Sequence, residues 1–251
     1  MKAGGAERYR VETSVGEVWF YGRPGLRERS RPTILMLHGA FGTAHGLIGW
    51  FDHLEPHADL LLASLPRHGG APALTRPGVG GYVSAFAEAI RLALPDRPLL
   101  VVGQSLGGLV ALGLAGHGHP VVAFDPFLTT AKLWPVGATI RRMQARGESY
   151  DETFVEEVFG FRAGRVVDRD RRNLVARLAA PTLVAAGTVP LRPPRDLEHA
   201  PSLLDEEDRA LLISNPRVRF VAFEGLGHTL MEDAPDRSRD LILEALDAAV
   251  S

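Results

Sequence analysis

The chain has 251 residues, of which 45% are hydrophobic and 23% charged; this suits one substantial globular domain and argues against a disordered or fibrous protein. It contains no cysteine, which excludes a disulfide framework, a thiolate nucleophile and a Cys-ligated metal. A formal net charge of −2 provides no broad attraction for nucleic acid or for an anionic membrane, so we expect neither as a partner.

The predicted elements begin with an antiparallel hairpin at a sheet edge, formed by residues 9–15 and 17–21 on either side of Gly16. Short apolar runs that are typical of buried strands follow at 33–37, 60–65, 99–102, 121–124, 182–186 and 218–223. Helical patterns occur at 81–94, 106–116 and 236–250. This alternation predicts an α/β protein in which helices cover a mostly parallel sheet.

The alternation of strands and helices lapses over residues 129–179. This segment is predicted to be helical and contains four aromatic side chains, Trp134, Phe154, Phe159 and Phe161. We expect it to be an insertion over the carboxyl edge of the sheet, in a core made of residues 1–128 and 180–251. The alternative is a helical excursion on the surface with no contact to substrate. Two interpretations of its side chains stay open: the aromatic residues line an apolar pocket or belong to the core, and Arg141 and Arg142 hold a substrate carboxylate or phosphate or lie on a solvated face.

Ser105 is the candidate nucleophile. It lies in Gly103-Gln104-Ser105-Leu106-Gly107-Gly108, between a predicted strand and a predicted helix. A sharp strand-to-helix turn that exposes a serine hydroxyl needs small residues two positions before and two positions after the serine. Gly103 and Gly107 meet this requirement.

A serine hydroxyl needs a base, and His228 is the candidate because it follows the last predicted strand. His38 is expected to shape the loop that follows the 33–37 strand. The remaining histidines singled out are two pairs without the further ligands that a zinc site requires: His53 with His57, and His117 with His119. We therefore expect no metal.

Negative charge that develops on a substrate carbonyl needs N–H donors already in place. The N–H of Leu106 follows the candidate nucleophile directly. The glycine-containing loop His38-Gly39-Ala40-Phe41-Gly42 offers a second donor, from Ala40 or Phe41.

Together, the segments 38–42, 103–108 and Gly227-His228 resemble the α/β-hydrolase superfamily, in their order and their spacing. The resemblance covers essentially the whole chain. It implies an eight-stranded, mostly parallel twisted sheet with helices on both faces, and a cap inserted after the sixth strand. It also implies a Ser–acid–His triad in that chain order.

The acid departs from the common pattern of that superfamily. Many members carry it after the seventh strand, where this chain reads Gly187-Thr188-Val189-Pro190 and has no carboxylate. Some members take the acid from the end of the sixth strand instead, which is Asp125 here. Because any carboxylate that reaches the imidazole can orient it, Asp196 and Glu198 stay open as alternatives to Asp125.

The expected function is a serine hydrolase that cleaves a carboxylic ester or thioester through an acyl-enzyme, without a cofactor. Alternatives are a C–C bond hydrolase with the same triad and a non-catalytic binding protein that kept the fold. The expected partner is a small-molecule acyl substrate, and the protein is expected to be a monomer or homodimer. The polar first ten residues, and the absence of an apolar run of 18 residues, lead us to expect a cytoplasmic protein.

Overall fold

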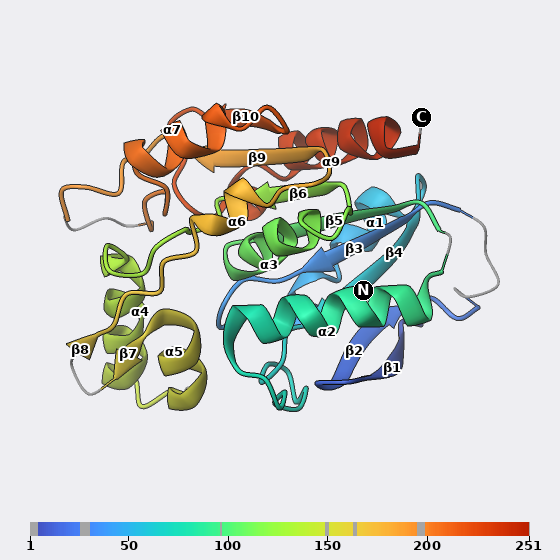
Figure 1. Ribbon diagram of the computed structural model, residues 1–251, viewed down its shortest axis with the longest axis horizontal. Helices are drawn as coiled ribbons and strands as arrows, with labels where there is room; N and C mark the ends of the chain where they lie inside the picture. The colour runs from blue at the N-terminus through green and yellow to red at the C-terminus, as the bar shows by residue number, and fades with distance from the viewer. Residues whose placement is uncertain are drawn as a thin grey trace.

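The computed structural model describes residues 5–25, 31–95, 97–148, 151–162, 165–194 and 199–250. Its centre is an eight-stranded sheet in the order β1-β2-β4-β3-β5-β6-β9-β10 (Figure 1). The strands are β1 Glu7–Thr13, β2 Gly16–Gly22, β3 Thr33–Leu37, β4 Asp59–Ser64, β5 Leu99–Gln104, β6 Val121–Phe124, β9 Thr182–Gly187 and β10 Val218–Phe223. The hairpin β1–β2 joins β4 antiparallel, and all other neighbours pair in parallel.

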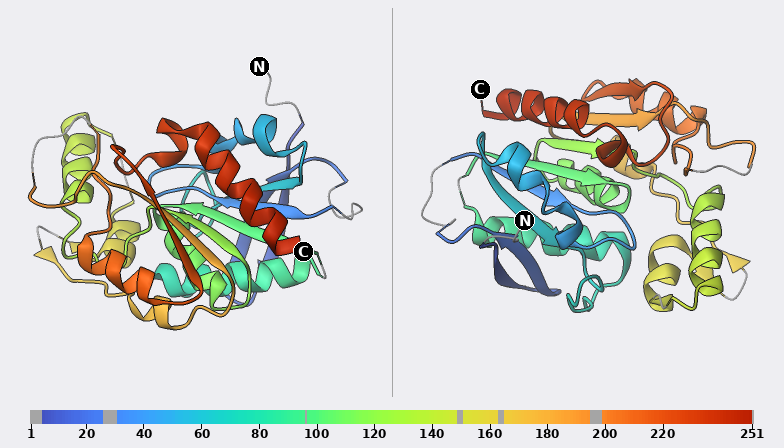
Figure 2. Two further views of the ribbon diagram at one scale, coloured as in Figure 1. Left: turned by 90° about the horizontal axis from the view of Figure 1, so that it is seen from above. Right: turned by 180° about the vertical axis from the view of Figure 1, so that it is seen from behind.

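The central strands are buried on both faces, so alternate side chains pack against different helices. In β3, Leu35 and Leu37 belong to one apolar cluster, and Ile34 and Met36 belong to the other. The first cluster includes α2 Gly78–Ala93, α3 Leu106–Ala115 and α7 Glu206–Ser214. The second includes η2 Ala44–Leu47, α1 Trp50–Leu54, α8 Leu230–Asp233 and α9 Pro235–Val250. Figure 2 shows α1 and α9 together on the face opposite α2.

The strand order reverses between β3 and β5. β4 lies on one side of β3, whereas β5 and then β6 lie on the other. In open α/β sheets, ligands bind at the carboxyl ends of the strands beside such a switch point. The loops that follow β3 and β5 are therefore the first place to search for a site.

The described residues of the 129–179 segment (129–148, 151–162 and 165–179) lie at the end of the sheet toward which β6 and β9 point (Figure 1). They form α4 Trp134–Ala145, α5 Glu152–Phe159, a small hairpin of β7 Phe161–Arg162 and β8 Arg165–Val166, and α6 Asn173–Ala176. Of the aromatic residues of this segment, Phe154 and Phe159 are buried in the core, and the indole N–H of Trp134 donates to Leu191 O at 2.7 Å. Arg141 and Arg142 are exposed.

The predicted fold class is confirmed, and the predicted strands and helices agree with the structure to within a few residues at their ends. The sequence-based prediction missed η2, α1, α7 and α8, and the β7–β8 hairpin in the segment expected to be helical. α7 carries a clear start signal, since the side chain of Asp205 accepts from Asp208 N at 3.1 Å. Leu212 is the one fully buried apolar side chain of α7. The helix therefore lacks the regular spacing of apolar residues on which the prediction of helices depended. No helix in the described ranges combines the length and the apolar character needed to cross a membrane.

Candidate active site

Ser105 occupies the sharp turn between β5 and α3. Its backbone has φ 57° and ψ −115°, which is a strained conformation for a residue with a side chain. The turn is held by a hydrogen bond from Ser105 N to Phe124 O, at 2.8 Å, which ties it to the end of β6. Backbone strain that persists in a buried, well-bonded turn is common where a side chain must be held in a functional position.

The two glycines of the motif are needed for steric reasons. A Cβ at position 103 would lie 2.2 Å from the carbonyl oxygen of Gly107, and a Cβ at position 107 would lie 2.3 Å from Leu37 O. Real Cβ atoms do not approach backbone this closely. The glycines therefore let the start of α3 pack against β5 and β3, as expected from the need for small residues on either side of Ser105.

The loop after β3 passes beside the candidate nucleophile. A Cβ at Gly39 would lie 3.3 Å from Ser105 Cβ. In this loop, Phe41 has a positive φ of 62°. Within the described part of the chain, the N–H groups of Ala40, Phe41 and Leu106 have no hydrogen-bond acceptor. They are thus available to a ligand.

His38 holds this loop in place. Leu65 N donates to His38 Nε2 at 3.0 Å, so the ring proton is on Nδ1, which donates to Gly39 O at 2.7 Å. Burial lowers the pKa of His38 to about 3, because the charged form would lose its hydration. A neutral His38 is therefore part of the loop's structure, in agreement with the role expected for it.

His228 follows β10, and its Nδ1 lies 2.6 Å from Asp125 Oδ2. Asp125 follows β6, is fully buried and has a positive φ of 42°. The pairing occupies Nδ1, and no described residue is hydrogen-bonded to Nε2 of His228. The two alternative acids, Asp196 and Glu198, lie outside the described residues.

The carboxylate of Asp125 has two further partners, which the sequence argument missed. Ser202 Oγ donates to Oδ1 at 2.6 Å, and Leu203 N donates to Oδ2 at 2.8 Å. Both donors come from the segment after β9. Three hydrogen bonds thus fix both oxygens of a carboxylate that has no contact with solvent.

The loop that carries His228 packs on the same segment. His228 N donates to Ala200 O at 2.9 Å, and a Cβ at Gly227 would lie 2.1 Å from that oxygen. Gly187, at the end of β9, packs equally closely against the loop that carries His228, since a Cβ at this position would lie 2.1 Å from Gly227 O. The loops after β6, β9 and β10 therefore meet in one cluster beside the turn that carries Ser105.

The predicted site residues lie at the ends of the strands that were expected to carry them: Ser105 after β5, Asp125 after β6, His228 after β10, and Ala40 and Phe41 after β3. Phe41 also reaches the 129–179 segment, with its ring centroid 5.9 Å from Phe154 and 6.2 Å from Phe159. Among the residues described, no group of three or more histidine and acidic side chains is arranged to bind a metal ion.

The fold and this arrangement of loops define an α/β hydrolase, and comparison with known proteins agrees. Residues 34–241 match the alpha/beta hydrolase family, to which the chain belongs. Over 82% of this chain and 83% of the relative, it is 28% identical to a pimeloyl-[acyl-carrier protein] methyl ester esterase of Chromobacterium violaceum. It is 25% identical to monoacylglycerol lipase abhd6-B of Xenopus laevis, over 77% of this chain and 58% of that protein.

Solved structures show the same fold. A carboxylesterase of Bacillus subtilis aligns with a TM-score of 0.68 at 14% identity, over 96% of this chain and 91% of that one. An esterase of Pyrococcus furiosus aligns with a TM-score of 0.65 at 16% identity, over 97% and 92% of the two chains.

Proposed function

We propose that this protein is a serine hydrolase of carboxylic esters or thioesters, with Ser105, His228 and Asp125 as its triad. The observation that carries the proposal is the 2.6 Å contact between His228 Nδ1 and Asp125 Oδ2, beside a serine in strained backbone geometry. The names of the relatives reported above, an esterase and a lipase, support ester substrates. A small-molecule acyl compound is the proposed partner.

In the acylation step, Ser105 Oγ attacks the substrate carbonyl carbon while His228 Nε2 takes the hydroxyl proton. Asp125 holds the ring through Nδ1–H and stabilises the imidazolium that forms. The carbonyl oxygen becomes an oxyanion, and the N–H groups of Leu106 and of Ala40 or Phe41 donate to it. His228 then gives its proton to the departing alcohol or thiol, and the acyl group stays on Ser105.

Deacylation follows the same steps, with water in place of Ser105 as the nucleophile. His228 takes a proton from water, the resulting hydroxide attacks the acyl-enzyme, and the proton returns to Ser105 Oγ as the carboxylic acid leaves. No oxidant, reductant or metal enters either step.

The segment 129–179 is proposed to be a cap over this site. It lies at the carboxyl end of the sheet, and its Phe154 and Phe159 pack against Phe41 in the proposed oxyanion loop. A cap that contacts the loop supplying an N–H donor would link substrate enclosure to oxyanion binding.

A fluorophosphonate probe tests the nucleophile. We expect mass spectrometry to locate one adduct on Ser105, which is lost in Ser105→Ala and falls sharply in His228→Ala. Glu224→Gln is a suitable control because Glu224 is exposed in the same loop as His228. An absence of labelling at every probe concentration would refute the proposal and favour a non-catalytic binding protein.

A second experiment tests the acid, with turnover of a p-nitrophenyl ester as the measurement. Asp125→Asn should lower kcat by about 10⁴, as removal of a triad acid does elsewhere. Asp196→Asn and Glu198→Gln should keep near-normal turnover. Large losses in either of these, with near-normal activity in Asp125→Asn, would move the acid to the loop after β9. A panel of p-nitrophenyl esters and acyl-CoA thioesters would then define the acyl preference.

A further inference from the structure

The segment after β9 supplies no carboxylate to the proposed triad, yet it surrounds the carboxylate that contacts His228. Ser202 and Leu203 donate to Asp125, and Ala200 O accepts from His228 N. Ser202 is itself anchored just beyond β9, because its N donates at 3.0 Å to the O of Val189, two residues after the end of that strand. One short segment therefore contacts both members of the acid–base pair.

The hydroxyl of Ser202 has its direction fixed by its other partners. A serine hydroxyl has one proton to donate and two lone pairs that accept. Arg209 Nη2 donates to Ser202 Oγ at 2.8 Å, and Leu204 N donates to it at 3.3 Å. Both lone pairs are thus occupied, and the single proton is left for Asp125 Oδ1 at 2.6 Å.

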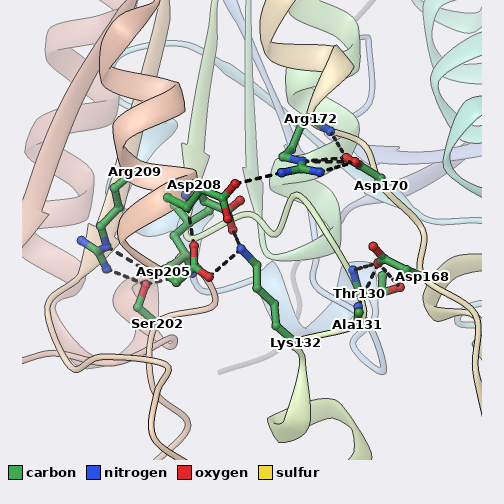
Figure 3. Close-up of polar contacts among 12 residues, drawn as sticks. Thr130, Ala131, Lys132, Asp168, Asp170, Arg172, Ser202, Asp205, Asp208 and Arg209 are labelled. Atoms are coloured by element: carbon green, nitrogen blue, oxygen red, sulfur yellow. Dashed lines mark hydrogen bonds and ion pairs between the residues drawn. The ribbon is translucent and has the colours of Figure 1, made fainter.

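Arg209 is held firmly in this position. It extends from α7, its Nε donates to Leu204 O at 3.1 Å, and Nη2 also donates to Gly187 O. Figure 3 shows Arg209 and Ser202 side by side, with Asp205 and Asp208 of the same region paired to Lys132. Ser202 is fully buried, so its hydroxyl and the oxygen of Asp125 that it contacts are shielded from bulk solvent.

We propose that Ser202, oriented by Arg209, is the positioning residue of the triad acid. In many α/β hydrolases the segment after this strand carries the triad acid. In this chain we propose that it instead holds in place Asp125, which follows β6. Ser202 acts through Asp125: it fixes the carboxylate plane so that Oδ2 stays aimed at His228 Nδ1. The inference rests on the proposed function, since it concerns the same acid.

The first test is Ser202→Ala, assayed with a p-nitrophenyl ester. Loss of one charge-assisted hydrogen bond to Asp125 should lower kcat by about 10- to 100-fold. KM should stay unchanged, because the fully buried Ser202 has no exposed surface for a substrate to contact. Ser202→Thr, which keeps the hydroxyl, should recover most of the rate. The matched control is Thr182→Val, which removes a buried hydroxyl bonded to Ala180 O at the far end of β9 and should leave kcat unchanged.

The second test separates positioning from a general structural role. If Ser202 acts through Asp125, then Ser202→Ala should change kcat by less than about twofold in an Asp125→Asn background. An equal loss in both backgrounds would overturn the proposal. A Ser202→Ala kcat within about twofold of wild type would overturn it as well.

A third measurement does not depend on turnover. At neutral pH, the proton between His228 Nδ1 and Asp125 should give a far-downfield proton NMR signal in the wild-type protein, which Asp125→Asn removes. In Ser202→Ala this signal should shift upfield or broaden, while in Thr182→Val it should stay in place. An unchanged signal in Ser202→Ala would refute the positioning role. A protein that shows the signal and its shift, but no Ser105-dependent turnover, would contradict the proposed function while retaining the positioning role.

Discussion

Gln104 Nε2 donates a hydrogen bond to Glu232 Oε2 at 3.0 Å, and this bond joins the residue before Ser105 to the short helix after His228. Gln104 is the variable residue that precedes the serine in the nucleophile motif, and only 7% of its surface is exposed. The contact links the loops of the proposed nucleophile and the proposed base directly, across 128 residues of sequence.

We predict that this contact sets the distance between nucleophile and base. Gln104→Ala and Glu232→Ala should each lower kcat for a p-nitrophenyl ester by about 10-fold, and the double variant should be no worse than either single one, because both remove the same bond. Glu224→Ala, at an exposed carboxylate of the neighbouring loop, is the control and should be neutral. Additive losses in the double variant would show that the two residues act separately.

A second prediction concerns the strain at Ser105. Ser105→Ala and Ser105→Gly should both lack activity, but the glycine variant should unfold with a free energy about 1 kcal/mol higher, because glycine tolerates a φ of 57°. Thermal unfolding of the two variants measures this difference. The matched pair is Ser84→Ala and Ser84→Gly inside α2, where the order should reverse, because glycine costs a helix interior about 1 kcal/mol relative to alanine. A less stable glycine variant at position 105 would show that the turn is not strained.

A third prediction follows from the lowered pKa of His38. In the unfolded chain this imidazole takes up a proton as the pH falls below about 6.5, whereas in the folded protein it stays neutral until about 3. Between about pH 6.5 and pH 3, the unfolded state therefore binds more protons than the folded state. As the pH falls through this range, His38 should lower the free energy of unfolding by up to about 1.4 kcal/mol per pH unit. Urea unfolding between pH 7 and pH 4 measures the slope.

The comparison for that experiment is His38→Gln, which cannot titrate. Its unfolding free energy should depend less on pH over the same range than that of the wild-type protein, whatever its value at pH 7. Identical slopes for His38→Gln and wild type would contradict the burial effect.

The fourth prediction concerns Lys132, whose Nζ lies 2.7 Å from Asp205 Oδ2 and 2.6 Å from Asp208 Oδ2 (Figure 3). Burial raises the pKa of Asp208, and Lys132 opposes this rise by stabilising the charged form. Lys132→Met should leave the buried carboxylate of Asp208 without its cation. We expect this to lower the free energy of unfolding at pH 8 by about 3–5 kcal/mol.

The pH dependence of that loss has a defined sign. A carboxyl group whose folded pKa lies above its unfolded value destabilises the protein as the pH rises, so Lys132→Met should recover stability as the pH falls toward 5. Adding Asp208→Asn should restore stability at pH 8 and remove this pH dependence. A Lys132→Met protein as stable as wild type at pH 8 would show that Lys132 does not stabilise the charged form of Asp208.

Several features could be predicted because their causes are local. In the β3 strand, Thr33 is followed by four consecutive apolar residues, and burial on both faces of a parallel sheet favours such a run. The turn at Ser105 was evident because Gly103 and Gly107 are the residues that steric contact with backbone demands at those positions. By the same reasoning, α7 and the β7–β8 hairpin escaped prediction, since their apolar patterns are too short or too weak.

The sequence by itself thus determined the strands of the eight-stranded sheet, the glycine-framed turn and the set of candidate side chains, because each depends on neighbours within a few residues. It left open which carboxylate His228 contacts, since a loop from any strand can bring an acid to the sheet edge. Only the tertiary structure joins His228 to Asp125 across 103 residues, and Ser202 to Asp125 across 77. Strand order and loop packing bring these partners together, and no local pattern of residues predicts either of them.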